Sequence, residues 1–261
     1  MIDHRIVRAL HVERLRKGDM GADLDASHAI FQTSTLDALL DGAYDGDVTF
    51  AELSERGDTG LGTLDALDGE MIALGGEFFQ ARANGSVRRI APTERTPFAV
   101  VARFEPDVHA TLAGPLEHAA LLGAIDALVE DREVCYALRI DGRFEAVRAR
   151  SVPAQKTPYP PLAEVIAHQQ EFELGELTGS IVGFQFPDYT QGLNVSGYHL
   201  HVISDARDAG GHLLDCRLLG GTLALDHSSD LHMELPVGVN VAEADTSERK
   251  RAAIERLEGE T

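Results

Sequence analysis

Short runs in which apolar and polar residues alternate recur along the chain and predict β-strands. MIALGGEFFQARANGSVRRI (71–90) has Gly-Gly and Asn-Gly turn dipeptides between its apolar runs, which predicts a meander. TPFAVVARF (96–104) predicts another strand, and VCYALRIDGRFEAVRARSV (134–152) predicts a hairpin that turns at Asp141-Gly142. The last third of the chain repeats the pattern in GSIVGFQF, GYHLHVIS, HLLDCRLLGGTLALD and DLHMELP.

Helical spacing of apolar residues is confined to a few segments. STLDALLDG (34–42) has a serine or threonine cap and a closing glycine, and TFAE (49–52) fits a capping box at the start of a second short helix. Longer helices are predicted for PLEHAALLGAIDALVED (115–131), which begins with proline, and for PLAEVIAHQQEFEL (161–174). TSERKRAAIERLE (246–258) predicts a capped, charged helix.

Strands thus outnumber long helices, and few strand–helix alternations occur, which favours an α+β fold with mixed or antiparallel sheets. We expect two strand-rich lobes, an N-terminal α+β lobe over 26–175 and a C-terminal β lobe over 176–245. Residues 1–25 are expected to be loosely ordered, and 246–261 to form a helix and tail.

Composition places the chain among ordinary globular proteins. Hydrophobic residues make up 44% of its 261 residues, and no apolar run approaches the roughly 18–20 residues that cross a bilayer. The polar N-terminus lacks the apolar core and cleavage site of a signal peptide, so a cytoplasmic protein without a membrane partner is expected. Cys135 and Cys216 lie in strand-like apolar runs and are expected to be buried thiols.

Acidic residues dominate the charge. There are 43 aspartates and glutamates against 23 lysines and arginines, giving a formal net charge of −20, and only three of the basic residues are lysines. This excess of carboxylate repels phosphate backbones and argues against nucleic acid as a partner. The acidic, lysine-poor composition resembles the surface of a salt-adapted protein, with simple acidic solubility as the alternative.

The segment GYHLHVISDARDAGGH (197–212) contains three histidines in an otherwise apolar strand pattern. His199 and His201 point to the same face of a strand because side chains alternate. A turn rich in aspartate and glycine follows, so an antiparallel return strand would bring His212 beside them. Two histidines alone often face water or core hydrogen-bond partners, but the third favours a metal site on the C-terminal lobe, near the lobe interface.

Three neutral imidazoles converging on an ion form an open site, with positions left for water or substrate. Zinc suits such ligands without redox chemistry; iron, nickel, cobalt and copper stay open from ligand type alone.

Two charged residues outside this segment are candidates for chemistry. Glu70 begins a predicted strand after a polar turn, where a carboxylate could carry a proton or simply face solvent. Arg150 lies near the end of the 134–152 segment and could hold a substrate carboxylate with both arms of its guanidinium. From the sequence alone, it could equally be a surface arginine like Arg148.

Six segments together resemble the α-acetolactate decarboxylase family, from about residue 30 to the C-terminus, in order and with similar spacing. They are IFQTSTLDALLDGAYDGDVTFAEL, GDTGLGTLDALDGEMIALGGEFFQ, TPFAVVARF, RIDGRFEAVRARSVPAQKTPYPPL, GFQFPDYTQGLNVSGYHLHVISDARDAGGHLLD and the closing helix.

The resemblance implies zinc-dependent conversion of (S)-2-acetolactate to (R)-acetoin and carbon dioxide, without thiamine or pyridoxal cofactors. It implies that the histidines are the zinc ligands, that Glu70 lies near the metal and that Arg150 contacts the substrate. It also implies a glutamate from the C-terminal segment, for which Glu258 is the best match and Glu255 the alternative. The expected partner is a small-molecule substrate, and a homodimer is compatible with the resemblance.

Two other function classes share part of the pattern. Cupin-type metal oxygenases also carry His-X-His on a strand and a later histidine, but they have a glutamate shortly after the pair. Here Asp205 and Asp208 are the only acids nearby. A metal- or sugar-binding β module without enzymatic activity would leave the segments around Glu70 and Arg150 unexplained.

Overall fold

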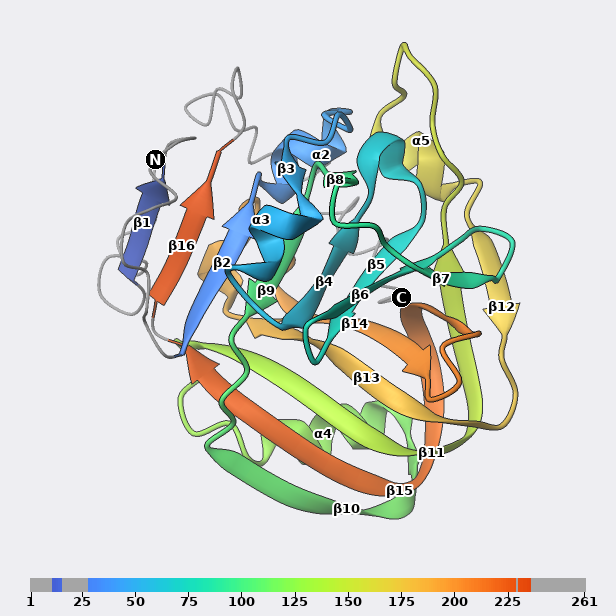
Figure 1. The fold of residues 1–261 in the computed structure, drawn as a ribbon. Helices are drawn as coiled ribbons and strands as arrows, with labels where there is room; N and C mark the ends of the chain where they lie inside the picture. The colour runs from blue at the N-terminus through green and yellow to red at the C-terminus, as the bar shows by residue number, and fades with distance from the viewer. Residues whose placement is uncertain (1–10, 16–27, 229, 236–261) are drawn as a thin grey trace.

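The computed structural model describes residues 11–15, 28–228 and 230–235, which form two packed β-sheets with a few short helices (Figure 1). The first sheet has the strand order β1-β16-β2-β9-β4-β5-β6-β7. Its strands are β1 (His11–Leu15), β16 (Asp230–Glu234), β2 (Ala29–Thr33), β9 (Ala99–Ala102), β4 (Thr59–Thr63), β5 (Glu70–Leu74), β6 (Glu77–Ala81) and β7 (Val87–Arg89). A small separate sheet pairs β3 (Val48–Thr49) with β8 (Arg95–Thr96).

The second sheet has the order β10-β15-β14-β13-β11-β12, with an additional pairing of β15 to β11. Because β11 pairs with β13 along one edge and with β15 along the other, and β14 joins β13 to the start of β15, these four strands form a closed circuit. The strands are β10 (Val108–Glu117), β15 (Gly210–Ser228), β14 (Gly197–Ser204), β13 (Leu177–Phe186), β11 (Cys135–Ser151) and β12 (Gln170–Glu173).

The prediction of a hairpin at Asp141-Gly142 is wrong, because these residues lie within the continuous strand β11. Gly142 pairs with Gly221 of β15 where the two backbones approach closely. A Cβ atom on Gly142 would lie 2.7 Å from Leu218 Cδ1 and 2.9 Å from the Gly220 carbonyl oxygen. The glycine therefore serves this close approach, and the local turn signal is overridden by a strand distant in sequence.

The two short predicted helices are present. Helix α2 (Leu36–Leu40) is capped by the Thr35 side chain, which accepts a hydrogen bond from the Ala38 amide. Helix α3 (Phe50–Ser54) begins with the predicted capping box: the Thr49 hydroxyl accepts from the Glu52 amide, and the Glu52 carboxylate accepts from the Thr49 amide.

The two longer predicted helices are shorter than expected, because neighbouring strands take over part of each segment. Residues 115–117 continue β10, which pairs with β15 through Glu117, and helix α4 covers His118–Asp126 alone. Likewise α5 ends at Ile166 after starting at Leu162, and β12 then pairs with the last residues of β11. Hydrogen bonds to a partner strand outweigh the local helical spacing in both cases.

The predicted meander at 71–90 is confirmed as β5, β6 and β7.

The predicted lobe boundary near residue 175 does not coincide with the division between the sheets. Strands β10 and β11 precede residue 175 but belong to the second sheet, and β16 follows it but belongs to the first. Residues 11–15, within the segment expected to be loosely ordered, form a strand parallel to β16. The predicted C-terminal helix lies outside the described residues.

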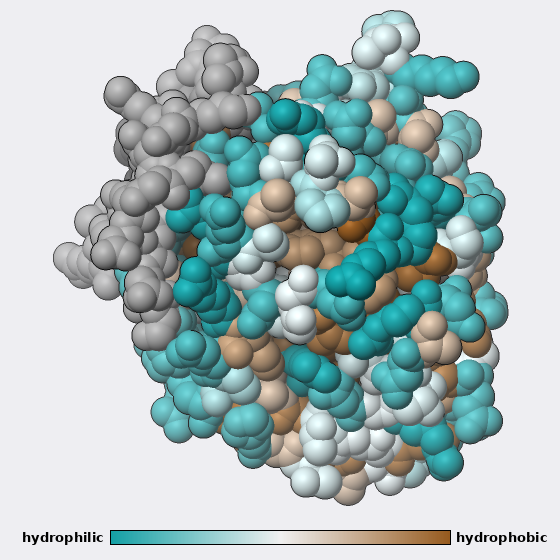
Figure 2. All heavy atoms as spheres, viewed as in Figure 1, coloured by the Kyte–Doolittle hydropathy of each residue, from teal (hydrophilic) through white to brown (hydrophobic). Residues whose placement is uncertain are grey.

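Apolar side chains fill the space between the sheets. Ile72 and Phe79 of the first sheet pack with Val182 and Ile203 of the second. On the face drawn in Figure 2, hydrophilic residues surround a central area where apolar residues reach the surface.

Cys135 and Cys216 are buried free thiols, as predicted. Among the described residues, no helix combines the length and apolar character that a membrane crossing requires.

Candidate metal centre

The three histidines meet at the face of the second sheet that packs against the first. His201 of β14 and His212 of β15 are direct antiparallel partners, and His199 lies two residues earlier on the same face of β14. Their ring centroids are 5.2 Å (199–201), 5.1 Å (199–212) and 5.3 Å (201–212) apart. One ligand atom from each lies within 4.8 Å of the others, close enough for one ion after small side-chain adjustments.

Hydrogen bonding fixes the orientation of one ring. His201 Nδ1 lies 2.8 Å from the backbone oxygen of Met71 in β5. Because a carbonyl oxygen only accepts, Nδ1 must carry the hydrogen and Nε2 must carry the free lone pair. Among the described residues, His201 Nε2 and His199 Nδ1 are buried without a hydrogen-bond partner. Buried polar atoms normally have a partner, and a metal ion would satisfy both.

Burial also sets the charge of the rings. Removal from water lowers the pKa of His201 to about 3, and the positive charge of Arg150 adds to the decrease. Burial likewise lowers the pKa of His199 and His212 well below the usual value, reinforced by Arg150 and by neighbouring imidazoles. All three rings are therefore neutral near pH 7, the state in which imidazole binds metal.

Glu70 and Arg150 stand beside the histidines although they come from different sheets. Glu70 is the first residue of β5, and its Oε1 lies 3.4 Å from Arg150 Nη1, while its Oε2 lies 3.6 Å from His201 Nε2. Arg150 of β11 is the cross-strand partner of His212. Burial raises the pKa of Glu70 to about 7, with the nearby guanidinium acting in the opposite direction.

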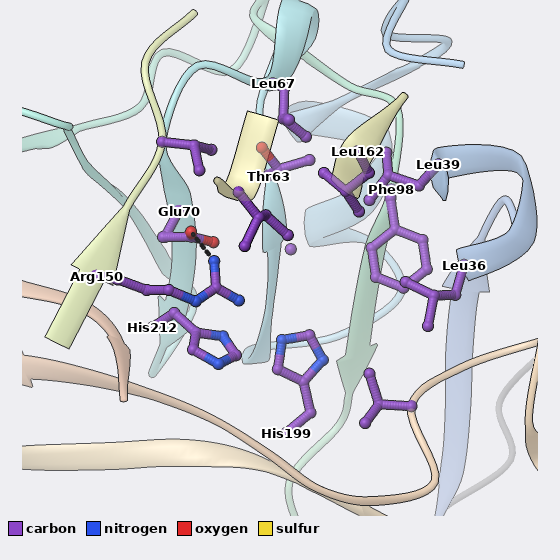
Figure 3. Close-up of a pocket in the computed structure, with 14 residues that line it drawn as sticks. Leu36, Leu39, Thr63, Leu67, Glu70, Phe98, Arg150, Leu162, His199 and His212 are labelled. Carbon is purple, nitrogen blue, oxygen red and sulfur yellow. Dashed lines mark hydrogen bonds and ion pairs between the residues drawn. The ribbon is translucent and has the colours of Figure 1, made fainter. Parts of the chain in front are cut away.

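Glu70, Arg150, His199 and His212 line one cavity of about 520 Å³, a volume that includes open solvent. Figure 3 shows Arg150, Glu70, His212 and His199 on one side and the apolar side chains of Phe98, Leu36, Leu39 and Leu162 on the other. No sequence pattern distinguishes this apolar side, because leucines at helical spacing look like ordinary core residues. Thr63, the cross-strand partner of Glu70, was not predicted either; it lines the cavity and donates to the Gly69 oxygen.

The predicted grouping of the three histidines is present where the two sheets pack, and this donor set suits a metal. Three imidazoles leave coordination positions open, and this donor type does not select one transition metal. Glu255 and Glu258 lie outside the described residues.

Comparison with known proteins agrees with the geometry. A profile of the family described as Alpha-acetolactate decarboxylase matches residues 30–247. The chain is 44% identical to the alpha-acetolactate decarboxylase of Methylococcus capsulatus, over 98% of this chain and 99% of that protein. It is 43% identical to that of Klebsiella aerogenes, over 79% and 80% respectively. The crystal structure of the Bacillus subtilis strain 168 protein matches with a TM-score of 0.84 and 36% identity, over 88% of this chain and 99% of that chain.

Proposed function

This chain belongs to the α-acetolactate decarboxylase family, and from that premise we propose that it converts (S)-2-acetolactate to (R)-acetoin and carbon dioxide with the help of zinc. The observation that carries the zinc proposal is the group of three buried, neutral imidazoles, two of which, His199 and His212, line a cavity together with Glu70 and Arg150. His199, His201 and His212 would hold the ion. Family membership decides against a cupin-type oxygenase and against a β module without activity.

The chemical difficulty lies in the electron pair that decarboxylation leaves behind. When the bond between the carboxyl carbon and C2 breaks, carbon dioxide departs and the pair passes through C2 onto the neighbouring ketone oxygen as an enediolate. A divalent cation in this position supplies Lewis-acid stabilisation of that negative charge. Protonation at C2 then completes acetoin.

The side chains of this chain bind and orient the substrate around that step. The Arg150 guanidinium would hold the departing carboxylate or the enediolate oxygen, since it is permanently charged and offers paired donors. Glu70 would orient these groups or carry the proton, because a carboxyl whose pKa is near 7 exchanges protons readily at neutral pH. The apolar side of the cavity would exclude water around the reacting carbon.

The proposed activity predicts acetoin formation from racemic 2-acetolactate by the purified full-length chain. Only about half of the substrate is expected to react rapidly, because a single enantiomer fits the asymmetric site. Prior treatment with a chelator should abolish the activity, and added zinc should restore it. The assay should be run in low and high salt, because the acidic composition predicts better retention of activity at high salt. Undiminished turnover after complete, verified metal removal would contradict the zinc proposal.

We also propose that a glutamate from the C-terminal segment completes the site, with Glu258 as the first choice and Glu255 as the alternative. The two are compared as Glu258→Gln and Glu255→Gln, which remove the charge and keep the shape. The expected result is a loss of kcat of about tenfold or more in the first variant and little change in the second, in line with the effect of a group near a metal. The reverse pattern would assign the role to Glu255, and wild-type kcat in both would exclude the proposal.

A further inference from the structure

The apolar side of the cavity is built from segments that are distant in sequence. Leu36 and Leu39 come from helix α2, and Val195 comes from the connection that leads into β14 and its histidines. Val195 is 1% exposed and Leu36 is 4% exposed. The distance between α2 and this connection therefore decides how much room the apolar side offers.

A pair of buried amides ties this connection to β2, the strand that leads into α2 and contains Gln32. Asn194 Nδ2 donates to Gln32 Oε1 at 2.9 Å, and both side chains are almost fully buried. Gln32 Nε2 in turn donates to the backbone oxygens of Ser34 and Leu193, at 2.9 and 2.7 Å. The Asn194 side-chain oxygen accepts from the Val195 amide at 2.7 Å. Both polar atoms of each amide group therefore have a hydrogen-bond partner.

The backbone reinforces the same connection. The Leu36 amide donates to the Leu193 oxygen at 3.0 Å, and the Asp37 amide donates to the Gly192 oxygen at 3.1 Å. The first turn of α2 is thereby docked directly on the residues that precede Val195. Gly192 has a φ of +88°, and a Cβ atom there would lie 3.3 Å from the Asp37 carboxylate. Glycine therefore suits this position, both for its backbone conformation and for the close Asp37 side chain.

We propose that Gln32 and Asn194 are positioning residues that set the spacing between Val195 and helix α2, and through it the size of the alkyl group that the site accepts. This inference rests on the proposed function, in which the charged end of the cavity takes the carboxylate and oxygens of a 2-hydroxy-3-oxo acid. The alkyl substituent of the substrate then faces Val195, Leu36 and Leu39. Neither amide touches the substrate, and each acts through Val195 and the first turn of α2.

A polar pair suits this task better than apolar packing. Hydrogen bonds are directional, so a fully satisfied network fixes one arrangement, whereas apolar side chains of similar volume can repack in several. Apolar replacement of both partners can still preserve stability, because no buried donor or acceptor is then left unsatisfied in the pair itself. Stability and spacing can therefore be separated by experiment.

The test compares 2-acetolactate with its homologue that carries an ethyl group in place of the methyl group on C2. Val195→Ala is expected to raise the ethyl-to-methyl ratio of kcat/KM about tenfold, the effect typical of one methylene in an apolar pocket. Asn194→Ala and the double variant Gln32→Met/Asn194→Leu are expected to raise it about threefold or more. The control is Val147→Ala, which empties the same volume at a fully buried position in the other core and should leave the ratio unchanged.

A second measurement does not depend on turnover. Calorimetry with 2,3-dihydroxy-2-methylbutanoate and its 2-ethyl homologue gives an affinity ratio for acids that lack the ketone and cannot decarboxylate by this route. The same variants should shift this ratio in the same direction. The wild-type chain could bind these acids, and the variants could shift the affinity ratio as expected, while the wild-type chain releases no carbon dioxide from acetolactate. The proposed function would then fail and the positioning role would stand.

The positioning role is overturned by any of three results. The Asn194 variants could fold and keep the wild-type ratio, which would make the amide pair purely structural. Val147→Ala could shift the ratio as much as the Asn194 variants, which would show that any loss of core packing changes the ratio. The wild-type chain could bind neither dihydroxy acid.

Discussion

Replacing His212 with alanine is expected to remove both the bound metal and catalytic turnover. The three rings are the donors that converge, with one atom of each within 4.8 Å of the others, and two imidazoles alone hold zinc weakly. Without the ion, the charge that develops on the substrate oxygen loses its main stabilisation, so activity should fall by at least about a thousandfold. Metal content by mass spectrometry and acetoin formation are measured on the same preparation. His199→Ala should lose metal and turnover in the same way.

His118→Ala is the matched control for this experiment. His118 is half-buried on α4, where its Nδ1 lies 3.7 Å from Cys216 Sγ. Its loss should leave metal content and turnover near the wild-type values. Thermal unfolding shows whether each variant is folded, and His212→Gln provides a second variant that fills more of the space. A folded His212 or His199 variant with full metal content and activity would refute the ligand assignment.

The grouping of the three histidines could be predicted from the sequence, because all three lie within one short segment. Strand alternation places His199 and His201 on one face, and the turn that follows is short enough to return His212 directly beside His201, as the register shows. Glu70 and Arg150 are a different case. They are 80 residues apart in sequence and meet through the packing of two sheets, which no local pattern encodes. The family resemblance, rather than periodicity, selected them.

The errors in predicted elements have the same origin. The Asp141-Gly142 dipeptide carries a sound turn signal, but its glycine is needed where β11 passes β15 closely. Apolar spacing in 161–174 predicts a helix, yet its last residues complete the edge of the second sheet as β12. Gln32 and Asn194 are 162 residues apart, so no local sequence pattern could predict the hydrogen bond between them. Contacts between distant segments decided each case.

Arg150→Ala is expected to retain the metal but to lose most activity. Arg150 is 6% exposed and lines the cavity, so its loss removes a buried, permanent positive charge where the substrate carboxylate would sit. Loss of one such preorganised group typically costs about a hundredfold to a thousandfold in kcat. The measurement pairs metal content with kcat and KM. Arg148→Ala is the control, since Arg148 is on the same strand but pairs with Glu171 near the surface.

Folding of the Arg150 variant needs a separate argument, because Glu70 loses the cation that lies 3.4 Å from its Oε1. That cation opposes the effect of burial on the Glu70 pKa, so its removal should raise this pKa further and leave the carboxyl protonated at neutral pH. A neutral carboxyl costs far less to bury than a charged one, and the fold should survive. The variant Arg150→Met/Glu70→Gln removes both charges and isolates this effect. Loss of metal from folded Arg150→Ala would instead assign Arg150 a structural role at the metal centre.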